Sequence, residues 1–125
     1  VYENYGEISQ ISSNQYNYEL NFEKVDIRLM VAPSPYNPTE GTLKIQYQLS
    51  QNSETSIAIY SLSGHKIYES TALSGSTGGL KGQNTLVWNG KYNGNNIAPG
   101  LYVVILKVGS NESAIIKTKR LGVKW

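Results

Sequence analysis

The 125-residue chain contains no cysteine, one histidine and one aspartate. Without cysteine, neither a disulfide framework nor a thiolate metal site can form, and a structural zinc site is excluded because a second histidine is also missing. The single histidine, His65, lies in a predicted hairpin turn beside Ser63, where adjacent residues cannot present a nucleophile, a base and an orienting acid in line. The sequence therefore predicts no catalytic residues, no bound metal and no cofactor.

Long hydrophobic runs are also missing. No stretch approaches the roughly 20 apolar residues that a membrane-spanning helix needs, so no membrane span is expected. The first ten residues lack the basic and apolar regions of a signal peptide. Because the chain opens on Val1 rather than on methionine, we interpret it as a fragment or processed form. Residues that favour helix, such as alanine and methionine, are sparse, and no segment has a helical pattern.

What the sequence has instead is tyrosine, glycine and alternating apolar residues. Ten tyrosines and twelve glycines among polar residues are typical of a β-protein. Apolar and polar side chains alternate over 26–32 and 42–49, which predicts two strands that each bury one face. The first is expected to be an edge or first strand that ends at Pro33. The closely spaced prolines after it are expected to hold the connection extended.

Short apolar segments separated by turn residues follow. Segments 55–62 and 66–71 flank a glycine and predict a hairpin, whereas 73–84 is expected to be a flexible loop. Residues 101–108 are almost all apolar, which predicts a strand that is central or covered on both faces.

The last predicted strand, 113–125, carries lysines on the same face as Leu121, Val123 and Trp125. A bulge near Arg120 or Gly122 would reconcile this pattern with a buried face, and we expect one there.

About seven short strands with turn signals between them predict an all-β fold, an Ig-like or fibronectin III-like β-sandwich of about seven antiparallel strands. We assign the sandwich to residues 25–125. Residues 1–24 form an N-terminal extension, either the tail of a preceding domain or an added edge strand.

Three further patterns could each indicate a binding site, but each has a simpler structural interpretation. Asn93, Asn95 and Asn96 would hold Ca²⁺ only weakly, and a plain turn fits them better. The glycine-rich loop around Lys81 lacks both the spacing and the following helix of a phosphate site. A net charge of +2 is too small to predict nucleic-acid binding, and cations on an edge strand usually protect it against edge-to-edge pairing.

Four blocks of sequence, taken in order, resemble a known family. They read PSPYNPTEGTLKIQYQL, SIAIYSLSGHKIYE, GGLKGQNTLVWNGKYNGNNIAPGLYVVIL and KTKRLGVK. Over roughly residues 26–125 the chain is similar to the Ig-like domain first named from the flagellar hook-capping protein, and to the related C-terminal sorting domains of type IX secretion substrates. Ser34, Tyr36 and Ser61 depart from the residues that the family usually has at these places. The number, order and spacing of the blocks carry the likeness.

The matching residues are best explained as architecture. They include Pro35, Tyr36, Asn37, Pro38, Tyr60, Gly64, Trp88, Gly90, Gly100 and Tyr102. We expect Tyr36 to plug one end of the sandwich, Trp88 to lie in the core, and the glycines to occupy turns with unusual backbone angles. Tyr102 is expected to form a tyrosine corner, with its hydroxyl bonded to nearby backbone.

The resemblance implies a non-catalytic, extracellular or cell-surface module, appended C-terminally to a larger bacterial protein. Its partner would be a secretion or surface-attachment machinery, or neighbouring domains of the same protein, reached by docking of an edge strand. The residues expected to contact this partner are Lys117, Lys119, Arg120 and Lys124. Two alternatives stay open: a carbohydrate-binding accessory module, in which Tyr16, Tyr18 and Tyr92 stack on a polysaccharide, and a structural interaction domain of a hook-cap type assembly.

Overall fold

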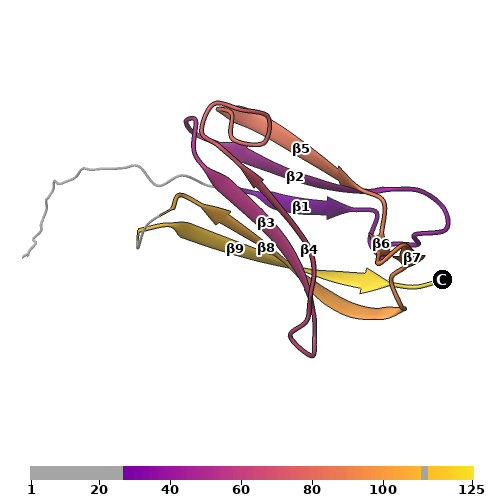
Figure 1. Ribbon diagram of the computed structural model, residues 1–125. Helices are drawn as coiled ribbons and strands as arrows, with labels where there is room; N and C mark the ends of the chain where they lie inside the picture. The colour runs from indigo at the N-terminus through magenta and orange to yellow at the C-terminus, as the bar shows by residue number, and fades with distance from the viewer. Residues whose placement is uncertain (1–26, 111–112) are drawn as a thin grey trace, which may run out of the picture.

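The computed structural model describes residues 27–110 and 113–125, and these residues form strands without any helix (Figure 1). Seven strands build a two-layered sandwich, and two very short strands build a separate ribbon. The sandwich strands are β1 (Leu29–Ala32), β2 (Leu43–Leu49), β3 (Thr55–Ser61), β4 (Lys66–Ala72), β5 (Gly82–Trp88), β8 (Gly100–Val108) and β9 (Ile115–Val123). The ribbon strands are β6 (Lys91–Tyr92) and β7 (Asn95–Asn96).

The predicted all-β sandwich of about seven antiparallel strands is confirmed. Within the described part of the chain, no helix could cross a membrane. The predicted N-terminal extension lies outside the described residues.

The first layer has the strand order β1-β2-β5, with both pairs antiparallel. Its side chains alternate as the sequence predicts: Leu43 and Ile45 of β2 are fully buried, whereas Lys44 between them is exposed. This alternation places one face of the sheet in the core. β1 lies at the edge of the layer, which confirms the prediction of an edge strand.

The proline-rich connection between β1 and β2 is bent, and the expectation of an extended connection is wrong. The chain bends over residues 33–35, and the peptide bonds before Pro33 and Pro35 are cis. A turn then follows at Asn37, whose side-chain oxygen accepts a hydrogen bond from the backbone N–H of Thr39 at 2.9 Å. An asparagine side chain that accepts a hydrogen bond from the backbone N–H two residues further along mimics a backbone turn, so the chain reverses direction here.

The second layer has the order β4-β3-β8-β9, again antiparallel. β3 and β4 form the predicted hairpin, with Gly64 in its turn at φ +94° and an unpredicted register shift after Ile59. β8 is a central strand, as predicted. Val104 and Leu106 on its inner face are fully buried, whereas Leu101 on its outer face is 53% exposed.

β9 pairs with β8 along its whole length in one antiparallel register. The predicted bulge near Arg120 or Gly122 is therefore wrong. Without a bulge, Lys117 and Lys119 lie on the same face of β9 as the buried Leu121, and they are nevertheless exposed.

The position of β9 explains how charged residues can lie on an inward-facing row. Among the described residues, β9 is the outermost strand of its layer, and it is contacted from the other layer by β1. At this margin Lys117 and Lys119 on the inner face of β9 stay in contact with water. The charge pattern marks the open margin of the sandwich, and no backbone irregularity is needed to explain it.

Large apolar and aromatic side chains fill the space between the layers. Tyr36 is fully buried, and Trp88 is 4% exposed and stacks on Tyr68 with ring centroids 5.3 Å apart. The other fully buried large side chains are Leu43, Ile45, Ile57, Ile59, Val104, Leu106 and Leu121. Aromatic pairs at this spacing add to the stabilisation that burial alone provides.

The glycine-rich segment 73–81, expected to be a flexible loop, is tied to the body of the domain. The hydroxyl of Tyr47 donates to the carbonyl of Gly78 at 2.6 Å, and the N–H of Ser53 donates to the carbonyl of Gly79 at 3.1 Å. Gly79 is buried, and a Cβ there would lie 2.5 Å from the Ser53 carbonyl oxygen. The glycine thus serves close backbone packing, and β5 begins at Gly82, within the segment 73–84 that was expected to be a loop.

Candidate functional site: the edge of strand β9

Among the described residues, β9 is the outermost strand of its sheet, and none of them forms a strand beside its outer edge. At its C-terminal end Tyr36 covers this edge: the N–H of Tyr36 donates to the carbonyl of Gly122 at 2.8 Å, and the N–H of Lys124 donates to the carbonyl of Tyr36 at 3.0 Å. Gly122 therefore points its backbone groups away from β8. Because this orientation repeats every second residue, it extends down the strand. The residues that share it are Ile116, Thr118 and Arg120.

Among residues 27–110 and 113–125, no backbone group pairs with this lower stretch of the strand. A row of unpaired N–H and C=O groups is a template on which another extended chain can add as a further strand. We call this surface the β9 edge: the backbone of residues 116–120 together with the side chains of Lys117 and Lys119.

The predicted partner-binding cations lie at three different places. Lys117 and Lys119 form one row on the inner side of β9, opposite Leu106 and Val104 of β8. Arg120 points to the outer face of the sheet. Lys124 follows the end of the strand. All four are exposed, and the fold brings only the first two together.

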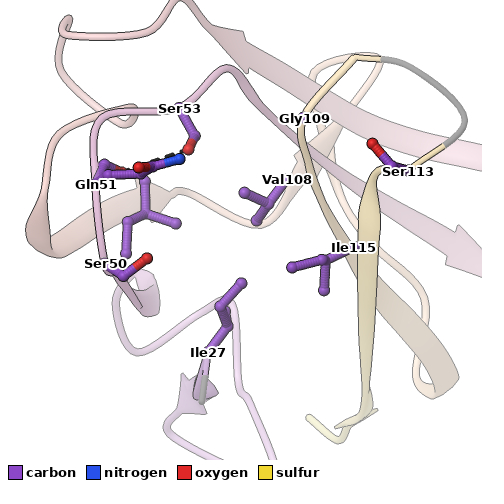
Figure 2. Close-up of a pocket in the computed structure, with 9 residues that line it drawn as sticks. Ile27, Ser50, Gln51, Ser53, Val108, Gly109, Ser113 and Ile115 are labelled. Atoms are coloured by element: carbon purple, nitrogen blue, oxygen red, sulfur yellow. Dashed lines mark hydrogen bonds between the residues drawn. The ribbon is translucent and has the colours of Figure 1, made fainter. Parts of the chain in front are cut away.

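A small apolar pocket lies between the layers at the start of β9 (Figure 2). Its volume is about 190 Å³, and the side chains of Ile27, Val108 and Ile115 point into it. Ser50, Gln51 and Ser53 lie on its other side. An apolar floor with a polar rim at the end of an unpaired strand is suited to one apolar side chain of an added segment.

Tyr36 fixes the C-terminal limit of the β9 edge. Its hydroxyl donates to the carbonyl of Gly41 at 2.9 Å, and its ring lies 6.3 Å from that of Trp88 between centroids. Burial raises the pKa of the Tyr36 hydroxyl above its usual value. A buried side chain held in this way keeps the backbone bonds to β9 in place, so Tyr36 acts as the plug that its sequence position suggests.

The β6–β7 ribbon stands next to the C-terminal end of β9 (Figure 1). The hydroxyl of Tyr102 donates to the carbonyl of Ala98 at 2.7 Å, which is the geometry of a tyrosine corner, and burial raises the pKa of this hydroxyl. The indole N–H of Trp125 donates to the carbonyl of Ile97 at 2.8 Å. Of the aromatic residues expected to stack on a glycan, Tyr92 lies on this ribbon and is 42% exposed, whereas Tyr16 and Tyr18 lie outside the described residues.

The remaining polar residues of interest contact one another or solvent. The hydroxyl of Ser63 lies 2.9 Å from that of Ser61, and His65 is exposed. The ammonium group of Lys91 donates to the side-chain oxygen of Asn96, so a cation of the protein already uses that oxygen. Within the described ranges, His, Cys, Asp and Glu side chains do not gather in a group of three or more.

The sequence from residue 35 to residue 121 matches the family described as secretion system C-terminal sorting domain, which is well over half of the chain. The chain belongs to this family. The resemblance to sorting domains of secretion substrates is thereby confirmed, and β9 lies within the matched range except for its last two residues. Among curated proteins, none matches the sequence.

Solved structures with the fold of this sorting domain are parts of much larger bacterial proteins. Dimeric latent PorU from Porphyromonas gingivalis matches with a TM-score of 0.60 at 15% identity, over 76% of this chain and 9% of that one. PorZ from the same organism, described as an essential surface component of the type IX secretion system, matches with a TM-score of 0.54 at 22% identity, over 78% and 11%. A β-glucuronidase from Parabacteroides merdae matches with a TM-score of 0.52 at 15% identity, over 79% and 13%.

At these identities the likeness establishes the fold alone. The sorting domain spans only about a tenth of the length of each of these proteins.

The sequence did not indicate two features at the C-terminal end of β9. The first is the parallel bridge between Tyr36 and Val123, which joins the connection between β1 and β2 to the last residue of β9. The second is the β6–β7 ribbon, which was expected to be a plain turn. Its signal was the Asn93-Gly94 pair, because two residues at positive φ are what a tight hairpin turn requires.

Proposed function

We propose that this sorting domain is a non-catalytic module that directs a larger bacterial protein through a type IX secretion system to the cell surface or the extracellular space. The family match supports the sorting role. The fold shared with PorZ, itself described as a component of that system, supports the assignment to type IX. The observation that carries the mechanism is the β9 edge, whose backbone groups are unpaired within the described part of the chain, since a sorting signal must present a surface that another protein can bind.

The mechanism is addition of a partner strand to the β9 edge. Main-chain hydrogen bonds to residues 116, 118 and 120 supply affinity without regard to side chains. Lys117 and Lys119 supply selectivity, because their row favours acidic residues at alternate positions of the added strand. The pocket beside Ile115 receives an apolar side chain of the same strand and fixes how far along β9 it lies.

Substitution of Thr118 by proline tests the backbone part of this mechanism. The N–H of Thr118 faces the free edge, so proline removes a donor that β8 does not use and places its ring where the partner strand would lie. With the chain fused to a reporter in a bacterium that has a type IX system, Thr118→Pro should leave the domain folded and abolish export. Lys119→Pro is the matched control for folding, because it removes a donor of the β8–β9 ladder and should unfold the domain.

Charge reversal tests the selectivity. The double variant Lys117→Glu/Lys119→Glu should reduce export of the reporter strongly, whereas reversal of Lys44 and Lys107, which are exposed on other strands, should not. Adding Arg120→Glu to the first variant should change little, because Arg120 lies on the other face of β9. Deletion of residues 112–125 should abolish export. Export of a folded Thr118→Pro variant at the level of the unmodified chain would contradict strand addition, and export of the deletion variant would contradict the sorting role itself.

A further inference from the structure

A second recessed surface lies at the opposite side of the molecule from the pocket at the start of β9, between the β3–β4 turn and the β6–β7 ribbon. Its volume is about 450 Å³, which falls within the range of roughly 300–1,000 Å³ typical of small-molecule sites. The other concave surfaces described for this domain hold about 180 to 200 Å³. By its size, this groove can accommodate a small ligand rather than a single side chain.

The groove has the chemical character of a site for a neutral polyol. Its floor is apolar and includes the buried Ile97, and the ring of Tyr92 lies on its wall with 42% of the residue exposed. Around them are hydroxyl and amide groups and one imidazole, contributed by Ser61, Ser63, His65, Asn93, Asn95 and Asn96. Among the described residues that line it, no carboxylate, lysine or arginine is present. The ammonium group of Lys91 lies beside the groove, but it is already bonded to the side-chain oxygen of the lining residue Asn96, so the lining itself offers an ionic ligand little counter-charge.

Three of these side chains have hydrogen-bonding capacity to spare within the described part of the chain. The amide of Asn93 and the imidazole of His65 make no side-chain hydrogen bond there, and the amide of Asn95 has only a long contact of 3.5 Å to the carbonyl of Asn93. Amides offer both donors and acceptors, which is what a sugar hydroxyl requires. An aromatic ring with an exposed face next to such groups can cover the apolar side of a sugar ring.

The ribbon that carries Tyr92 is held in a fixed position. The N–H of Ile97 donates to the carbonyl of Gly90 at 2.9 Å, and the same residue's carbonyl accepts from Trp125 at 2.8 Å. The backbone N–H of Lys91 donates to the side-chain oxygen of Asn89 at 3.0 Å. A wall anchored at its base loses little conformational freedom when a ligand binds, and a preorganised site binds more tightly for that reason.

We propose that this groove binds a neutral saccharide, with Tyr92 stacking on a sugar ring and the amides of Asn93 and Asn95 bonding its hydroxyls. The proposal is independent of the sorting role, because the groove shares no residue with the β9 edge. A sorting domain with such a site would hold its parent protein against a polysaccharide after export.

The experiment measures binding of the purified 125-residue chain to an array of neutral oligosaccharides built from glucose, mannose, galactose and N-acetylglucosamine, with uronic-acid and sialylated saccharides as an acidic set. We expect binding to one or more neutral structures, followed by titration calorimetry with the best of them. Tyr92→Ala should weaken that binding at least about tenfold, as loss of a central aromatic contact does. Tyr92→Phe should keep most of it, because the ring face remains.

Asn93→Gly tests whether the side-chain amide of Asn93 bonds the saccharide. The substitution should not strain the backbone, because Asn93 has φ +53° and glycine adopts positive φ freely. It should weaken binding about 2- to 10-fold, as expected for one lost hydrogen bond. Tyr60→Ala, on the outer face of β3, is the matched control and should bind normally. Absence of binding to every neutral saccharide, binding to the acidic set alone, or equal binding by Tyr92→Ala and the unmodified chain would each overturn the proposal. None of these results would bear on export.

Discussion

Replacement of Gly90 by alanine should destabilise the sorting domain more than replacement of any glycine that is needed only for its backbone angle. Gly90 has φ +75°, and a Cβ there would lie 2.5 Å from the Tyr36 hydroxyl oxygen and 2.8 Å from the Cβ of Pro38. Gly94 provides the comparison, because it has φ +82° and a Cβ there would meet nothing within 4 Å. Alanine at either position would therefore carry the backbone strain of a positive φ, but only at position 90 would its Cβ also clash with packed side chains.

The magnitudes follow from these two contributions. A non-glycine residue in the left-handed region costs roughly 1–2 kcal/mol, and forcing an extra carbon into a packed core costs about 1–3 kcal/mol more. Gly94→Ala should therefore lower the free energy of unfolding by about 1–2 kcal/mol, and Gly90→Ala by about 2–5 kcal/mol. Adding Tyr36→Phe to Gly90→Ala removes the hydroxyl oxygen that the new Cβ would meet first. The loss in the free energy of unfolding caused by Gly90→Ala should then be smaller than in the chain with the unmodified Tyr36.

Urea denaturation, followed by tryptophan fluorescence, measures these differences. With a denaturant slope of about 1–3 kcal/mol/M, a gap of about 2 kcal/mol between the two variants separates their midpoints by roughly 1 M. Equal midpoints for Gly90→Ala and Gly94→Ala would refute the reasoning, because they would mean that the Tyr36 ring does not pack against Gly90. If Gly90→Ala costs the same in the Tyr36→Phe background as in the unmodified chain, the assigned contact with the hydroxyl is wrong.

Three other predictions concern the corner, the buried tyrosines and the register of β9. Tyr102→Phe should cost about 0.5–1.5 kcal/mol in urea denaturation, because only the hydroxyl that bonds the carbonyl of Ala98 is lost; no loss would mean that the corner is not formed. Burial raises the pKa of three tyrosine hydroxyls in the folded chain, so their contribution to stability is complete below the unfolded value near 10 and is lost as the pH rises through the folded values. The melting temperature should therefore not change from this cause up to about pH 9.5 and should fall above about pH 10. A melting temperature that stays constant to about pH 12 would contradict this prediction. Ile105→Cys with Thr118→Cys should form a disulfide on oxidation, because these two residues lie opposite each other in a pair without ladder hydrogen bonds between them. Ile105→Cys with Lys119→Cys should form none. The reverse result would mean that the register of β9 is shifted by a bulge.

Much of the fold was accessible from local patterns. Alternation over residues 42–49 predicted both a strand and its buried face, because side chains on a strand point to opposite sides in turn. The apolar run at 101–108 predicted a central strand for the related reason that a strand with two neighbours is the best covered. The tyrosine after Pro35 and the tyrosine at the head of β8 could be placed as a plug and a corner, since both roles depend on short stretches of sequence.

The candidate sites depend on contacts between distant segments. The alternation of the last strand showed that lysines share a face with Leu121, but only the position of β9 at the edge of its sheet showed that the lysines on this face lie open to water. A local pattern determines which side chains share a face, whereas the place of the strand within the two layers determines whether that face is covered.

The sequence alone therefore determined the class of fold, most strands of the sandwich and the family of sorting domains, because each rests on periodicity or on ordered motifs along the chain. The tertiary structure alone decided that Tyr36 ends the free edge of β9, and that the β3–β4 turn and the ribbon carrying Tyr92 line the same groove. These arrangements join residues that lie far apart in the sequence, and such contacts are set by how the two layers pack and not by any pattern within one segment.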